Sequence, residues 1–205
     1  MKLNRVMLLV TSAMFLVMSP LQADDLTPKM GEDGVYHFDW YHQSFLELED
    51  DINEALASGK VLMVKFDQKG CIYCEKVALD VLTDPVINKY VRDNFTVVQL
   101  DIFGNRDVTD IDGTVLSESK MAQRWGVVFT PSIYFIAEPP KGDQLPQAAA
   151  AVMPGAFGKI TFFGMLNGSK PGPIKRNLGS KNIMATISKP YATRSRQARQ
   201  ADVLR

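Results

Sequence analysis

Two cysteines three residues apart, Cys71 and Cys74, limit the possible folds more than any other part of the sequence, and they are the only cysteines in the chain. An apolar run, 61–64, precedes them and a helix-compatible run, 75–79, follows them. This pattern predicts a strand, a tight turn at Gly70 and then a helix that starts at Cys71. The i, i+3 spacing places both sulfurs on one face of the first helical turn, where they are close enough to form a disulfide.

The position of Cys71 also indicates reactivity. The first turn of a helix has amide groups without partners, and the helix dipole is positive there. Both effects favour a thiolate over a thiol, and Lys69 adds positive charge nearby. Because the thiolate is the species that attacks a disulfide, we expect Cys71 to be a nucleophile and Cys74, one turn further in, to be the shielded resolving thiol.

The cysteine pair allows two other interpretations. Two closely spaced cysteines are half of a zinc site, and His37 and His42, the only histidines, would supply two more ligands. No second closely spaced ligand pair follows the cysteines, so we expect no metal. A purely structural disulfide is the other interpretation, but it would close a loop too short to restrain the unfolded chain.

The N-terminus has the pattern of a secretory signal. Lys2 and Arg5 precede an uncharged run over 6–18, which is shorter than the ~20 residues that span a bilayer. We expect a signal peptide over 1–23, cut after Ala23. An uncleaved anchor is the alternative. In either case the cysteines reach an oxidising compartment, where a single pair is more consistent with use than with scaffolding.

Periodicity and turn residues predict the elements between residues 35 and 167. Ser44 and Glu47 form a capping box, with Phe45 on the apolar face of the helix that follows. Asp112-Gly113 is a hairpin turn signal, and the nearby carboxylates are expected to be solvated. The predicted strands are 35–38, 61–66, 96–101, 132–137 and 148–153, and the predicted helices are 44–58, 71–82, 85–94, 117–126 and 157–166; the hairpin acids are Asp107, Asp110 and Asp112.

Composition divides the chain into four parts. We expect a mobile segment over 24–34, a folded domain over 35–167 and a disordered basic tail over 168–205 behind the signal peptide. From Lys170 onward there are nine Lys or Arg and one acid, Asp202. A solvated extension is the favoured interpretation of the tail, with weak attachment to anionic surfaces as the other. The formal net charge of zero gives no bias towards nucleic acid.

The order of elements resembles the thioredoxin fold over about 35–167. This is an α/β fold of three layers, with a mixed sheet and helices on both faces. The chain is more closely similar to the periplasmic thioredoxin-like thiol:disulfide interchange proteins of sulfur-oxidation and cytochrome-maturation systems. The segments that carry this resemblance are Gln68–Cys74, Leu82–Pro85, the inserted flap with Asp112-Gly113, and Thr130-Pro131 before a strand.

The resemblance implies that Pro131 is cis and lies beside Cys71, which leaves the Thr130 backbone free to pair with an extended client. We expect Thr130, Pro131, Ile72 and Tyr73 to contact that client.

One position departs from the pattern of cytoplasmic thioredoxins. Lys65 stands where those proteins have a buried aspartate that helps proton transfer. We expect its amine to reach Asp67, Asp101 or solvent. Lys65 and Lys69 are then the candidates for tuning the pKa of the reactive thiol.

The resemblance implies a periplasmic thiol:disulfide oxidoreductase that reduces disulfides of client proteins. The chain has no Gly-rich nucleotide motif, so we expect no cofactor beyond the Cys71–Cys74 disulfide. We expect the electrons to come from another protein, a membrane thiol carrier. A monomer is expected. The alternatives are a disulfide oxidase or isomerase, a metal-binding module that uses both cysteines, and a partner-binding module whose cysteines have no redox role.

Overall fold

The computed structural model describes residues 26–170. The predicted signal peptide, 1–23, lies outside the described residues, as do residues 171–205 of the predicted tail, 168–205. Within the described part, no helix is long and apolar enough to cross a membrane.

A four-stranded sheet in the order β4-β3-β7-β8 forms the centre of the domain. The central strand β3 (Val61–Asp67) runs parallel to β4 (Phe95–Asp101) and antiparallel to β7 (Ser132–Ile136), which pairs with the antiparallel edge strand β8 (Ala151–Pro154). All seven residues of β3 are buried, which is typical of a strand covered on both faces. The predicted parallel pair and the antiparallel return strand are therefore confirmed.

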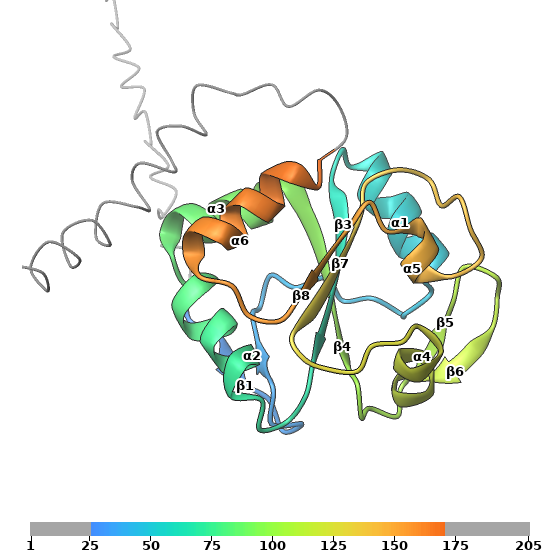
Figure 1. The fold of residues 1–205 in the computed structure, drawn as a ribbon, viewed down its shortest axis with the longest axis horizontal. Coiled ribbons are helices and arrows are strands. Elements are labelled where there is room, and N and C mark those ends of the chain that lie inside the picture. The colour runs from blue at the N-terminus through green and yellow to red at the C-terminus, as the bar shows by residue number, and fades with distance from the viewer. Residues whose placement is uncertain (1–25, 171–205) are drawn as a thin grey trace, which may run out of the picture.

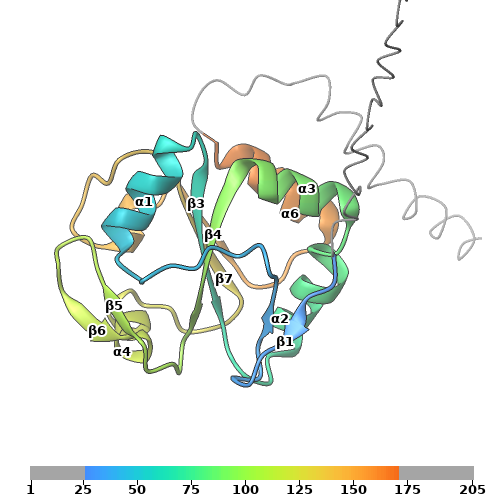
Figure 2. The same cartoon turned by 180° about the vertical axis from the view of Figure 1, so that it is seen from behind.

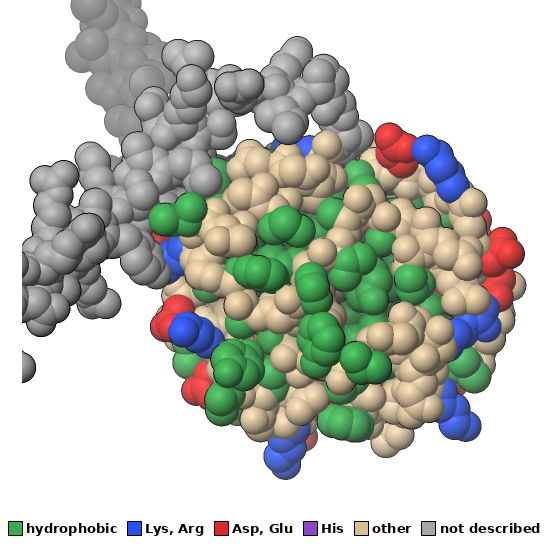
Figure 3. Space-filling view, viewed as in Figure 1, with side chains coloured by type: hydrophobic (Ala, Val, Ile, Leu, Met, Phe, Trp, Pro, Cys, Tyr) green, Lys and Arg blue, Asp and Glu red, His purple; other side chains and the backbone are tan. Residues whose placement is uncertain are grey.

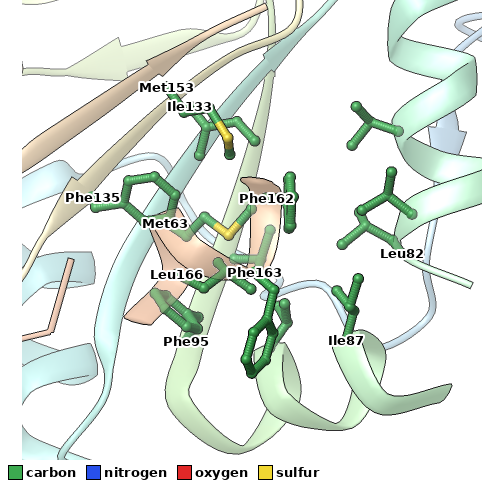
Figure 4. Packing of buried hydrophobic residues seen from close by; sticks show 14 of the residues in the cluster. Met63, Leu82, Ile87, Phe95, Ile133, Phe135, Met153, Phe162, Phe163 and Leu166 are labelled. Atoms are coloured by element: carbon green, nitrogen blue, oxygen red, sulfur yellow. The ribbon is translucent and has the colours of Figure 1, made fainter. Parts of the chain in front are cut away.

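Helices cover both faces of this sheet and make three layers (Figure 1; Figure 2). The helices α2 (Ile72–Lys76), α3 (Pro85–Asn94) and α6 (Lys159–Gly168) lie on one side. On the other side lie α1 (Leu48–Ala57), α4 (Glu118–Arg124) and the short α5 (Leu145–Ala148). A hydrophobic core lies on each side of the sheet. Figure 4 shows the core on the side of α2, α3 and α6, where Phe162, Phe163 and Leu166 of α6 pack beside Met63 and Phe135 of the sheet.

Two small antiparallel pairs extend this framework. The strands β5 (Asp107–Thr109) and β6 (Val115–Ser117) form the predicted hairpin, and Gly113 in its turn has a φ of 78°. The strands β1 (Lys29–Met30) and β2 (Tyr36–His37) pair near the N-terminus. The prediction placed only the second of these strands, because a two-residue strand carries no usable periodicity.

The predicted start of the first helix is wrong. The helix α1 begins at Leu48, not at Ser44, and no side chain caps it. The Ser44 hydroxyl instead accepts from the Leu46 amide at 2.6 Å and donates to Asp51 at 2.6 Å. Leu46 takes a left-handed φ of 64°, and Phe45, predicted to be on the apolar face, is 95% exposed. The serine therefore organises a loop ahead of the helix rather than its first turn.

The prediction that the hairpin carboxylates are solvated is wrong for Asp110. This side chain is buried, and its oxygens accept from the Trp125 indole at 2.8 Å and the Leu145 amide at 3.1 Å. Arg124 lies 3.2 Å from the same carboxylate. Asp110 thus ties the flap to α4 and α5, contacts that sequence spacing does not reveal.

Candidate functional site

The cysteine pair lies at the carboxyl end of β3, as predicted. After Asp67 the chain turns at Gly70, whose φ of 72° suits glycine, and the Cys71 amide bonds back to the Gln68 carbonyl at 3.3 Å. Cys71 is the N-cap residue of α2. The helix then continues through a π-helical turn, Val77–Val81, into Leu82, close to the predicted end.

The two cysteines form a disulfide, with an S–S distance of 2.10 Å and a Cα–Cα distance of 5.2 Å. Cys74 is only 5% exposed, whereas Cys71 is half-buried. A partner therefore reaches Cys71 more readily than Cys74. This asymmetry matches the expected division between an attacking and a resolving sulfur.

Two hydrogen-bond donors point at the sulfur of Cys71. The Cys74 amide lies 3.0 Å from Cys71 Sγ, and the Thr130 hydroxyl lies 3.2 Å from the same atom. When the disulfide opens, a negative charge on Cys71 Sγ accepts both bonds. Donors to the charged form lower the pKa of a thiol, so this geometry favours the thiolate.

The loop before β7 brings Thr130 and Pro131 to the cysteines. The Thr130–Pro131 peptide bond is cis, as the resemblance implies. Ser132 donates to the Phe129 carbonyl at 2.8 Å, and the Gly155 amide donates to the Pro131 carbonyl at 2.7 Å, so both sides of the loop are fixed. A role for the Thr130 backbone was predicted, but the contact of its hydroxyl was not, because a contact across 59 residues has no local signal.

Exposed apolar side chains surround the cysteine pair. Ile72 and Tyr73, between the cysteines, are 69% and 59% exposed, and Val128 and Phe129 are also exposed just before Thr130. Figure 3 shows hydrophobic side chains gathered over β8 and around the loop that precedes β7. Val128 and Phe129 were not predicted as site residues. An apolar pair directly before Thr-Pro, outside the strand, was the available signal.

Lys65 is buried behind the cysteines and paired with a carboxylate. Its amine bonds Asp67 Oδ2, which also accepts from the Gln99 side-chain amide, and Lys65 and Asp67 are each 1% exposed. The expectation that the amine reaches Asp67 is confirmed. Burial and the nearby Asp67 charge raise the pKa of Tyr41 well above its usual value. Asp67 compensates the Lys65 charge. An influence of Lys65 on the pKa of Cys71 remains a prediction.

Lys69 is exposed in the turn before Cys71 and runs along the β1–β2 pair. A Cβ atom added at Gly34 would lie 2.8 Å from Lys69 Cγ, which shows how closely the two segments approach. The Lys69 side chain therefore lies beside the turn that joins β1 and β2. Its tuning of the Cys71 pKa also remains a prediction.

The two histidines contact carboxylates, not the cysteines. His37 contacts Asp33 at 2.9 Å, and His42 lies 3.4 Å from Asp51. Within residues 26–170, no group of three or more Cys, His, Asp or Glu side chains is arranged to hold a metal ion.

The comparisons with known proteins address the fold. A family model described as a thioredoxin-like domain matches residues 48–160, more than half of the chain. No curated protein matches the sequence.

Among solved structures, a thioredoxin from Thermus thermophilus is 22% identical, with a TM-score of 0.45, and the match covers 58% of this chain and 81% of that one. A thioredoxin-fold protein from Helicobacter pylori is 20% identical, with a TM-score of 0.43 and coverage of 66% and 86%. At these values the family assignment rests on the family model rather than on the structural neighbours.

Proposed function

Because this chain belongs to the thioredoxin-like domain family and carries a disulfide-forming cysteine pair, we propose that it is a protein-disulfide reductase. The observation that supports this proposal most is the environment of Cys71. Its sulfur receives two donors and is more accessible than that of Cys74. A nucleophile needs an accessible, stabilised thiolate, whereas a structural disulfide needs neither.

The reaction follows from this arrangement. In the reduced protein, the Cys71 thiolate attacks one sulfur of a client disulfide, that S–S bond breaks, and the second client sulfur leaves and takes up a proton. Cys74 then loses its proton and attacks Cys71 Sγ in the mixed disulfide. The first client sulfur leaves as a thiolate. The client gains two electrons, and the protein ends as the Cys71–Cys74 disulfide, the state in the structure.

The client would contact the surface around Cys71. Thr130 offers a backbone next to Pro131 for an extended segment, and the exposed Ile72 and Tyr73 offer apolar contact. The signal-like N-terminus supports a periplasmic location. Electrons would come from a membrane thiol carrier, and we propose that the protein acts as a monomer on cysteine-bearing clients.

The direction of electron flow is supported by the residues between the cysteines. Strong oxidants stabilise their thiolate heavily, but Ile72 and Tyr73 bring no cation to the pair. This favours a reductant over an oxidase or isomerase. A reduction potential of about −120 mV would reverse that conclusion.

A trapping experiment tests the proposal. The Cys74→Ser variant should accumulate mixed disulfides with clients, because no second thiol resolves them. The Cys71→Ser variant is the matched control and should trap few. Equal trapping by both variants would overturn the roles assigned here. Stoichiometric zinc or copper in anaerobically purified protein, lost on mutating either cysteine, would replace the redox function with a metal-binding one.

A further inference from the structure

A cavity of about 200 Å³ lies beside the disulfide, on the side formed by the N-terminal strands. Met30 and Tyr36 line one wall, and Ile72 and Ala78 line the other, together with both cysteines. Any molecule that places a sulfur atom at this disulfide can therefore extend neighbouring atoms into the cavity. Since Gln99 donates to the Tyr36 carbonyl at 3.1 Å, the β1–β2 wall is attached to the sheet.

The buried pair Lys65 and Asp67 also lines this cavity. One carboxylate oxygen, Asp67 Oδ2, accepts from Lys65 and Gln99. The other, Asp67 Oδ1, is buried and has no hydrogen-bond partner among the described residues. A buried carboxylate oxygen without a donor is costly, so this atom favours a ligand that brings one.

We propose that the cavity is a subsite for an uncharged O–H or N–H donor, carried a few atoms from the sulfur that reacts with Cys71. The inference rests on the proposed disulfide reduction and specifies its substrate. The donor would bond Asp67 Oδ1 while the substrate sulfur lies at the disulfide.

The charges around the cavity favour a neutral donor. Lys65 already compensates Asp67, so a cationic group would lose its hydration without meeting an unpaired charge. An anionic group would meet the carboxylates of Asp67 and Glu75, which both line the cavity. A hydroxyl or amide satisfies the free oxygen without either cost.

Two sources can supply this chemistry. One is a client protein with Ser, Thr or Asn beside its reactive cysteine. The other is a small disulfide that carries a hydroxyl group. Tyr41 is a competing donor from within the protein, because its buried hydroxyl has no partner and its pKa is raised partly by the Asp67 charge. Tyr41 does not line the cavity. If its hydroxyl donated to Asp67 Oδ1, that oxygen would already have a partner, and a donor on the ligand would give no preference.

The test compares rates with matched disulfides. The reduced protein is given bis(2-hydroxyethyl) disulfide and diethyl disulfide in one arm, and peptide disulfides with Ser or Ala beside the cysteine in the other. We expect the donor-bearing member to be favoured, and the preference to fall about fivefold in Lys65→Met/Asp67→Leu, the change expected from one hydrogen bond. Taking the ratio of the two rates cancels differences in intrinsic thiol reactivity.

Two further variants complete the design. Asp80→Asn removes an exposed carboxylate outside the cavity and should keep the wild-type preference. Met30→Trp narrows the mouth from an exposed position and should reduce the preference even if the double variant fails to fold.

The outcomes separate the two proposals. A preference that falls in the cavity variants in only one arm identifies the source of the donor. An unchanged ratio in the folded double variant, or in Met30→Trp if the double variant does not fold, means that the cavity holds water only and overturns the subsite. Failure of the wild type to reduce any disulfide overturns the proposed function instead.

Discussion

The Thr130 hydroxyl offers the sharpest test of how the site activates its sulfur. Thr130→Val keeps the shape of the side chain and removes one of the two donors to Cys71 Sγ. Hydrogen bonds to charged groups contribute about 1.5–3 kcal/mol. Sulfur is a weak acceptor and Thr130 is half-buried, so we take the low end, about 1.5 kcal/mol. The pKa of the Cys71 thiol should then rise by about one unit.

The assay is the pH dependence of alkylation of Cys71, measured in a Cys74→Ser background so that one thiol titrates. Thr130→Ser is the matched control, because it retains the hydroxyl. In the protein with both cysteines, a less stable thiolate makes the reduced form less stable. At pH values above the thiol pKa, the reduction potential should therefore fall by about 30 mV.

Equal pKa values for Cys71 in the Val and Ser variants would contradict this prediction. That result would mean that the Cys74 amide and the helix start alone set the thiolate, and that the 3.2 Å contact has no energetic role. A fall in the pKa of Cys71 on removing the hydroxyl would contradict the sign of the argument as well as its size.

Three further predictions concern stability, each measured by urea unfolding. Lys65→Met leaves Asp67 buried and unpaired and should cost about 3–5 kcal/mol, most of which Lys65→Met/Asp67→Leu should recover. Gly70→Ala meets no neighbouring atoms but requires a left-handed alanine, and should cost about 1 kcal/mol. Burial raises the pKa of Asp51 above 3.8, so wild-type stability should lose a contribution as pH rises from 3.8 through the native pKa, a loss absent in Asp51→Asn.

Local patterns predicted the elements that carry strong signals. The predicted succession of strand, turn and helix around Cys71 was confirmed, with boundaries correct nearly to the residue. Asp84 and Pro85 restart the next helix as cap and first residue, because both preferences are local properties of the backbone. The predicted helix start at Ser44 was wrong, because the Ser44 hydroxyl bonds the Leu46 amide and Asp51 in a loop ahead of α1.

Residue spacing within short segments predicted most of the strands and helices and placed two sulfurs within bonding distance, because both are local properties of the chain. The surroundings of those sulfurs do not follow from such spacing. The Thr130 hydroxyl, the buried Asp67 beside Lys65 and the cavity under the N-terminal strands come from distant parts of the chain. Their meeting depends on packing of the whole domain, which no local periodicity records.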